Sequence, residues 1–193
     1  AAASAKNSII SMGRKGFPIT PARLREIYGE LISKGAHNIN LVTPTPYTQA
    51  ILESLADPLP VPVVYNCGGY ESIETIDRFK GKVQIYLPDF KYLDPTLAER
   101  YSGAVDYPQV AAEAILRMYD QVGPYELDDD GILKKGVIIR HLILPGCVDN
   151  TKAVIDWVRN HFEGRPGFIQ FDAPIRALRP GRRLSGNQPS FDR

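Results

Sequence analysis

Apolar and polar residues alternate along this chain in two periods, one typical of strands and one typical of helices. Short runs rich in β-branched and aromatic residues, bounded by Gly, Pro or Asn, predict strands. These runs cover residues 38–43, 61–66, 83–87, 136–144 and 167–171. Between them, apolar residues recur every three or four positions, as on one face of a helix. The helices expected from this period cover 20–35, the surroundings of 51–55 and 73–79, 94–101, 107–122 and 150–162.

Capping residues mark the starts of several expected helices. Thr20-Pro21 and Asp94-Pro95 each combine a polar cap with a proline at the first helical position. Asn150 is expected to cap the last helix in the same way. The run Asp128-Asp129-Asp130-Gly131 lies between two short apolar segments and predicts a hairpin turn.

Five apolar strands joined by helices indicate one α/β domain built on a parallel sheet. Two architectures fit this order: an open doubly wound sheet and part of a (β/α) barrel. In both, functional side chains lie at the carboxyl ends of the strands and in the loops that follow. Residues that bind or react with a ligand are therefore expected at those positions.

Composition removes several classes of function. The chain has 193 residues and a net charge of +1, which argues against a general nucleic-acid binder. Two cysteines cannot build a disulfide framework and fit a reducing cytoplasm. No apolar run approaches the roughly 18–20 residues that cross a bilayer, and no signal peptide opens the sequence. We expect a cytoplasmic protein that binds neither nucleic acid nor membranes, with a flexible basic tail at 176–193.

Polar clusters follow four of the expected strands. They are Thr43-Pro44-Thr45-Pro46, Asn66-Cys67-Gly68-Gly69-Tyr70, Asp89-Phe90-Lys91 and Arg140-His141. The period of two places Asp89 and Lys91 on one face of their strand, and His141 opposite Arg140. An acid and an amine so placed can hold each other and a zwitterionic ligand. An exposed pair alone contributes little, but three neighbouring polar clusters favour a small-ligand site.

Motifs for other chemistries are missing from the sequence. It has no G-x-G-x-x-G, no phosphate-binding loop and no nucleophile elbow, and its histidines lack the spacing of a helical metal pair. Two alternatives remain open from the residues alone. One is a non-enzymatic α/β module that binds a small ligand. The other is a barrel lyase with Lys91 as Schiff-base amine, although Asp89 beside it favours the charged amine.

Four segments resemble radical SAM proteins, and most closely the PflX-like group related to pyruvate formate-lyase activating enzymes. They are 35–45 (GAHNINLVTPT), 64–72 (VYNCGGYES), 86–92 (YLPDFKY) and 140–146 (RHLILPG). The resemblance runs from about Asn7 to Phe162. It implies a partial (β/α) barrel that binds S-adenosylmethionine at the carboxyl ends of its strands. A [4Fe–4S] cluster supplies the electron that cleaves this cofactor, and the resulting radical acts on a protein or small-molecule substrate.

The resemblance also assigns roles to residues. Thr43-Pro44-Thr45-Pro46 stands where the family has the Gly-Gly-Glu-Pro element that receives the methionine amino group. Asp89 and Lys91 match the Asp-x-Lys element near the methionine carboxylate. The implied cofactor-binding residues are Asn40, Thr43, Thr45, Asn66, Asp89, Lys91 and Arg140. We expect the side chains of the last four to converge, with Lys91 and Arg140 meeting the carboxylate. Asp89 and the backbone carbonyls of Thr43–Thr45 would meet the ammonium or a bridging cation.

Two departures from the family pattern affect the expected activity. The C-x-x-x-C-x-x-C motif and the strand before it are absent, and Ala2 and Ala5 fall on the second and third cysteine positions. Alanine cannot ligate a cluster, so no metal ligands are assigned and the chain is expected to be inactive. Residues 1–16 are interpreted as the remnant of the cluster loop, and 17–175 as a barrel without its first strand. The strand edge at 38–43 is then expected to pair with a second copy or to be covered by residues 1–16.

Overall fold

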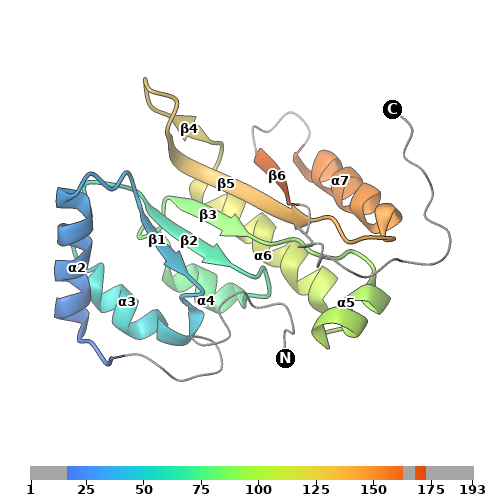
Figure 1. Ribbon diagram of the computed structural model, residues 1–193, viewed down its shortest axis with the longest axis horizontal. Coiled ribbons are helices and arrows are strands. Elements are labelled where there is room, and N and C mark those ends of the chain that lie inside the picture. Colours follow the sequence, from blue (N-terminus) through green and yellow to red (C-terminus); the bar gives the residue numbers. More distant parts are fainter. Residues whose placement is uncertain (1–16, 163–167, 173–193) are drawn as a thin grey trace, which may run out of the picture.

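The expected α/β fold with alternating helices is confirmed in the computed structural model, which describes residues 17–162 and 168–172 (Figure 1). The strands are β1 (Ile39–Val42), β2 (Val63–Cys67), β3 (Ile85–Pro88), β4 (Glu126–Leu127), β5 (Leu133–Leu142) and β6 (Phe168–Asp172). The helices are α2 (Pro21–Ser33), the short 3-10 helix η1 (Thr45–Tyr47), α3 (Thr48–Ser54), α4 (Ile73–Arg78), α5 (Pro95–Ser102), α6 (Tyr107–Val122) and α7 (Val148–Phe162). The expected cluster-loop remnant at 1–16 and basic tail at 176–193 lie outside the described residues.

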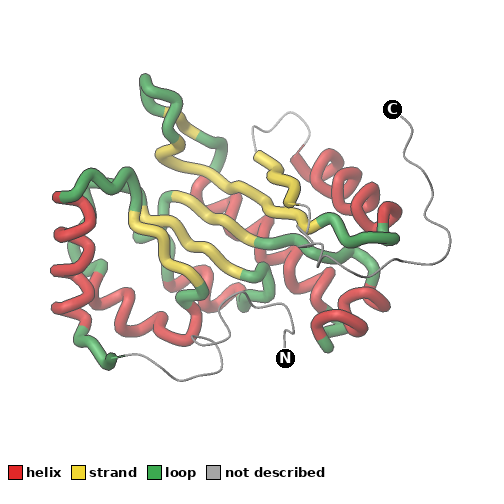
Figure 2. The backbone as a smooth tube through the Cα atoms, in the orientation of Figure 1, coloured by secondary structure: helices red, strands yellow, loops and turns green. Residues whose placement is uncertain are grey.

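The sheet is mostly parallel. Its strand order is β1-β2-β3-β5-β4, with β6 also paired to β5. The pairs β1–β2, β2–β3, β3–β5 and β5–β6 are parallel, and β4 runs antiparallel to β5. In the register of the sheet, Val42 lies opposite Asn66, and Asn66 lies opposite Leu87. The carboxyl ends of β1, β2, β3 and β5 therefore meet at one edge (Figure 2), which we call the carboxyl edge.

The predicted hairpin turn is confirmed between β4 and β5. One carboxylate oxygen of Asp128, Oδ1, accepts hydrogen bonds from the backbone N–H groups of Asp130 and Ile132. Strand β5 begins at Leu133 rather than at the predicted residue 136, because its first residues pair with β4. The hairpin therefore lengthens the strand that carries Arg140 and His141 to the carboxyl edge.

The hydrophobic core lies between one face of the sheet and the helices. Tyr65 and Tyr86 point into it from β2 and β3, and Ile115 and Met118 meet it from α6; all four are 0% exposed. Val64 and Ile85, one position away in β2 and β3, are buried but do not belong to this core cluster. Helices α4 and α6 lie behind the strands in Figure 1. We call the opposite side, which carries Asn66 and Arg140, the Asn66 face of the sheet.

Two of the predicted helix caps are confirmed and one is wrong. The side chains of Thr20 and Asp94 accept hydrogen bonds from the N–H groups of Arg23 and Thr96. Asn150 lies inside α7, which begins at Val148, so it does not cap that helix. Its side chain is buried and bonds instead to a loop that follows β3.

Strand β1 lies at one end of the sheet. Among the described residues it pairs only with β2, as expected for the edge at 38–43. The residues expected to cover that edge, 1–16, are outside the described part of the chain. No helix in the described part is long and apolar enough to cross a membrane.

Candidate functional site

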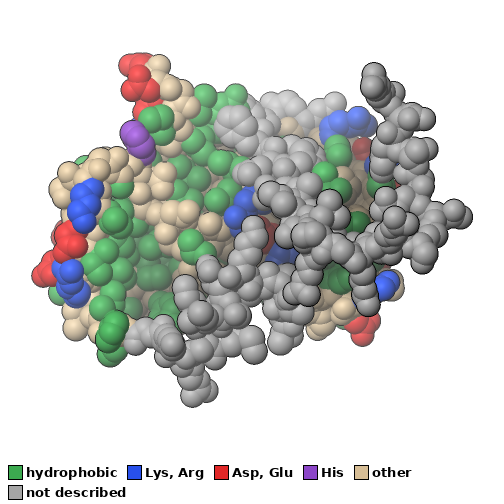
Figure 3. All heavy atoms as spheres, in the orientation of Figure 1, with side chains coloured by type: hydrophobic (Ala, Val, Ile, Leu, Met, Phe, Trp, Pro, Cys, Tyr) green, Lys and Arg blue, Asp and Glu red, His purple; other side chains and the backbone are tan. Residues whose placement is uncertain are grey.

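Four of the predicted side chains meet at the carboxyl edge, as expected. Arg140 Nη2 donates to Asn66 Oδ1 at 2.8 Å and lies 2.6 Å from Asp89 Oδ1. Lys91 Nζ lies 3.4 Å from Asp89 Oδ2. We call these four residues the Asp89 cluster. They come from the ends of three neighbouring parallel strands, and Figure 3 shows basic and acidic side chains together in this region.

The charges of the Asp89 cluster do not balance. Asp89 carries the single negative charge, and each of its oxygens is engaged by a different cation. The three charged side chains are one-quarter to one-third exposed, at 25% for Asp89, 26% for Arg140 and 33% for Lys91. Two cations against one carboxylate leave a net charge of +1. An anionic group is therefore the ligand that this arrangement attracts most strongly.

One donor of Arg140 is left without an acceptor. Its Nε is buried and forms no hydrogen bond within the described part of the chain. A buried N–H without a partner costs roughly 1–3 kcal/mol, so native proteins rarely keep one without a reason. A ligand oxygen placed against Arg140 would satisfy this group.

The hydroxyl of Tyr107 holds the loop that carries Asp89 and Lys91. It lies 2.9 Å from the carbonyl oxygens of Gly68 and Asp89, to which it donates, and accepts from Lys91 N–H at 3.1 Å. Tyr107 is 3% exposed, so water does not compete for these groups. One buried hydroxyl thus joins the ends of β2 and β3.

The same loop is held from the other side by His141. Its Nδ1 lies 2.7 Å from the carbonyl oxygen of Phe90, so this nitrogen carries the proton. Its Nε2 then accepts from Thr151 Oγ1 at 3.0 Å. The expectation that His141 faces away from Arg140 is confirmed, because His141 is fully buried on the core side.

Asn150 of α7 completes the support of this loop. Its Oδ1 accepts from the N–H groups of Leu93 and Asp94 at 2.9 and 3.3 Å, and its Nδ2 donates to the carbonyl oxygen of Lys91 at 3.1 Å. Together, Tyr107, His141 and Asn150 bind backbone groups of every residue from 89 to 94 except Tyr92. The positions of Asp89 and Lys91 are therefore fixed before any ligand arrives.

The side chains of the remaining predicted residues form no hydrogen bond or ion pair with the side chains of the Asp89 cluster in the described part of the chain, although Thr43 N–H donates to the backbone carbonyl oxygen of Asn66 at 2.8 Å. Thr45 Oγ1 donates to Glu71 Oε2 at 2.5 Å and lies 2.9 Å from the Tyr65 hydroxyl. Thr43 is exposed and has a left-handed backbone, with φ of 53°, which is strained for a β-branched residue. Asn40 is exposed on β1, and in the described structure its side chain bonds neither to the Asp89 cluster nor to Thr45 and its partners.

The two cysteines of the chain lie in different environments. Burial, together with the negative charge of Glu71, raises the pKa of the Cys67 thiol to about 12. Cys147 is half-buried in the loop before α7. Within residues 17–162, no group of three His, Cys, Asp or Glu side chains is arranged to hold a metal ion.

The raised pKa of Cys67 predicts unequal labelling of the two thiols. At pH 8 an alkylating reagent such as iodoacetamide should modify Cys147 and leave Cys67 unmodified, because the thiolate is the reactive form. Mass spectrometry of tryptic peptides should show one labelled site in the folded protein and two in denaturant. Equal labelling of both sites in the folded protein would contradict the burial of Cys67.

Comparison with known proteins shows similarity to an archaeal protein. The chain is 30% identical over 138 residues to an uncharacterized protein of Methanocaldococcus jannaschii, which covers 69% of this chain and 37% of that protein. The chain thus spans well under half the length of this relative. No protein-family profile matches the sequence.

Proposed function

We propose that this chain is a core of the radical SAM type that binds the amino-acid end of S-adenosylmethionine at the carboxyl edge of its sheet. The observation that carries the proposal is the Asp89 cluster with the buried, unpartnered Nε of Arg140. Parallel strands with helices packed on one face also fit a partial (β/α) barrel. The Asn66 face of the sheet would then correspond to the barrel interior.

The residues present fit the carboxylate of such a ligand. Arg140 offers its Nε–H, and Lys91 offers an ammonium on the other side of Asp89. Asn66 fixes the guanidinium through its Oδ1. Asp89 holds the two cations together and prevents their mutual repulsion. Binding a carboxylate here brings the site from a charge of +1 to neutrality.

A [4Fe–4S] cluster does not fit the residues of this chain. Such a cluster supplies the electron for cofactor cleavage in the family, and three thiolates hold it there. The 193 residues contain two cysteines, and the buried Cys67 keeps its proton at neutral pH. We therefore derive no cleavage step, and propose that this chain by itself binds the cofactor without cleaving it.

A second candidate function is a non-enzymatic module for another small anion. The net charge of the Asp89 cluster favours it, because a charge of +1 attracts carboxylates and phosphates alike. Titrations with S-adenosylhomocysteine, methionine and inorganic phosphate separate the two. Because they carry the same amino-acid end, S-adenosylhomocysteine and methionine should bind far more tightly than phosphate, and the reverse order would favour the anion module.

Replacement of Arg140 by Met tests the proposed site. Isothermal titration of S-adenosylmethionine should give one site per chain in the unmodified protein. In Arg140→Met the dissociation constant should rise at least tenfold, because a hydrogen bond to a charged group contributes about 1.5–3 kcal/mol.

The matched control is Arg117→Met. Arg117 pairs with Asp77 between α6 and α4, with Nε 2.6 Å from Oδ1, and so has the same kind of partner away from the carboxyl edge. This variant should bind with unchanged affinity. Lack of binding by the unmodified protein, or equal losses in the two variants, would refute the proposed site.

A further inference from the structure

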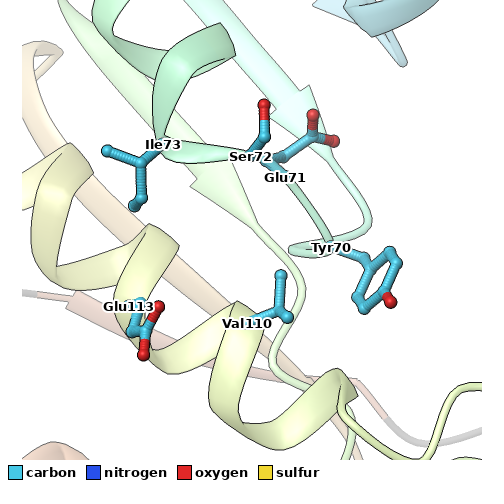
Figure 4. Close-up of a pocket in the computed structure, with 6 residues that line it drawn as sticks. All are labelled: Tyr70, Glu71, Ser72, Ile73, Val110 and Glu113. Atoms are coloured by element: carbon cyan, nitrogen blue, oxygen red, sulfur yellow. The ribbon is translucent and has the colours of Figure 1, made fainter.

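A surface pocket lies between the loop after β2, the start of α4 and the first half of α6. It has a volume of about 320 Å³ and is lined by residues 70–73, Val110 and Glu113. In Figure 4, Ile73 and Val110 point into the space between the two helices, whereas the Glu71 carboxylate points away from Val110 and Glu113. We call this space the Tyr70 pocket.

The walls of the Tyr70 pocket are apolar and partly exposed. Tyr70 is 49% exposed and Ile73 is 37% exposed. The ring of Tyr70 is held in place, because it stacks on the buried ring of Tyr107 with centroids 6.1 Å apart, and its hydroxyl donates to Asp106 at 2.9 Å. A fixed aromatic ring loses little conformational entropy when a partner packs against it. Exposed apolar side chains gathered around one pocket therefore indicate a surface for interaction.

The charged side chains around the Tyr70 pocket are acidic. Glu113 lines the pocket, Asp106 is bonded to its tyrosine wall, and Glu74 lies in the first turn of α4. None of these three carboxylates forms an ion pair in the part of the chain that the structure describes. One turn further along α6, Arg117 is already held by both oxygens of Asp77. The pocket is therefore complementary to a positive charge.

Helix N-termini offset part of this negative charge but not all of it. Asp106 precedes α6 and Glu74 begins α4, and a helix N-terminus carries roughly half a positive charge. Glu113 lies in the second turn of α6, where this effect has faded, and its hydrogen bond comes from the neutral amide of Gln109 at 3.1 Å. The charge of Glu113 thus remains without compensation at the pocket.

We propose that the Tyr70 pocket is a docking site for a protein partner and receives an arginine side chain of that partner. The aliphatic stem of arginine would pack on Ile73 and Val110, as such stems do on apolar surface. Its guanidinium would lie against the Tyr70 ring and bond to Glu113. This inference does not depend on the proposed function, because it uses none of the residues of the Asp89 cluster.

The surroundings of the pocket favour a polypeptide over a small cation. Val105, next to Asp106, is 57% exposed and extends the apolar surface beyond the pocket. A residue that flanks the arginine in a polypeptide would contact this surface, which a free amine or guanidine cannot reach. Arginine and tyrosine are also enriched in protein interfaces.

Blocked arginine tests the docking site. The first probe is N-acetyl-arginine amide, which presents what an arginine within a polypeptide presents, and the second is the citrulline counterpart, which has the same shape without the charge. Millimolar N-acetyl-arginine amide should shift the NMR signals of the Ile73 and Val110 methyl groups, and the citrulline probe should bind about threefold to fivefold more weakly. Unmoved methyl signals, or equal binding of the two probes, would refute the proposal.

Glu113→Gln identifies the carboxylate that binds the guanidinium. This variant should bind the arginine probe about threefold to fivefold more weakly and the citrulline probe as before. Glu99→Gln is the matched control, since Glu99 is also exposed on a helix but does not line the pocket, and it should bind both probes like the unmodified protein. Equal effects of the two variants would show only a general charge effect and would contradict the proposal.

A tripeptide separates a protein partner from a small cation. Acetyl-Leu-Arg-Leu-amide should bind more tightly than blocked arginine, because its leucines reach the apolar surface around the pocket, and Val105→Ser should reduce this gain. If the tripeptide binds no more tightly than blocked arginine, the pocket takes a small cation and a protein partner is wrong. Thermal midpoints of Glu113→Gln and Val105→Ser should equal that of the unmodified protein, because both side chains are exposed.

Discussion

Gly69→Ala is expected to destabilise the protein by about 3 kcal/mol, the largest effect of any single methyl group at the candidate site. Gly69 has a φ of 83°, and a Cβ added to it would lie 2.0 Å from the carbonyl oxygen of Asp89 and 3.1 Å from the Tyr107 hydroxyl. That oxygen belongs to the backbone and cannot turn away. The loop carrying Asp89 and Lys91 would have to shift, so affinity for S-adenosylmethionine should fall as well.

Gly35→Ala is the matched control for this substitution. Gly35 has nearly the same dihedral, with φ of 87°, but a Cβ there meets no atom within 4 Å. Only the left-handed backbone is penalised, which costs about 1 kcal/mol. Urea denaturation of the two variants measures the difference. Equal losses of stability would show that the β2 and β3 loops do not approach each other as closely as described.

The second large effect is expected from removing one oxygen atom. Tyr107→Phe keeps the ring but leaves Lys91 N–H without its acceptor, and the carbonyl oxygens of Gly68 and Asp89 without their donor. Because these groups are shielded from water, the free energy of unfolding should fall by about 2–3 kcal/mol. Exchange of the Lys91 amide with solvent deuterium should accelerate at the same time.

Tyr86→Phe provides the comparison for this variant. The Tyr86 hydroxyl is also part of a buried side chain, but it makes a single hydrogen bond of 2.7 Å, to Gln121 Oε1. Its loss should cost about 1 kcal/mol and leave exchange at Lys91 unchanged. If Tyr86→Phe were as damaging as Tyr107→Phe, the hydroxyl of Tyr107 would have no special part in holding the loop.

The convergence of Asn66, Asp89, Lys91 and Arg140 could be predicted because it depends on short-range rules. The period of two assigns each residue to a face of its strand, and parallel strands bring their carboxyl ends to one edge. The same rule placed His141 on the opposite face from Arg140. Neither rule requires knowledge of side-chain packing. Recognising the strands by their β-branched runs and the helices by their period was therefore sufficient to predict that these residues meet.

The supports of the site could not be predicted, since they join segments far apart in sequence. Asn150 has the residue type and position of a helix cap, but its side chain bonds to a loop 57 positions earlier, at Leu93. The sequence pattern places Tyr107 at the start of a helix, but it does not indicate that the Tyr107 hydroxyl bonds to Gly68, 39 positions away. Glu71 is a charged residue in a loop, and nothing in the sequence around it indicates that its side chain is buried. Side-chain bonds to distant backbone groups follow from tertiary packing, which local patterns do not contain.

The most direct test of the central claim is the NMR signal of the Arg140 Nε–H group during titration with S-adenosylmethionine. The signal is assigned by its loss in Arg140→Met. If the ligand carboxylate binds where we propose, this buried donor gains an acceptor, and its proton should move downfield and saturate at one ligand per chain. The Nε–H signal of Arg117 should stay in place. An Arg140 signal that does not move while the ligand binds would show that the cofactor is held elsewhere.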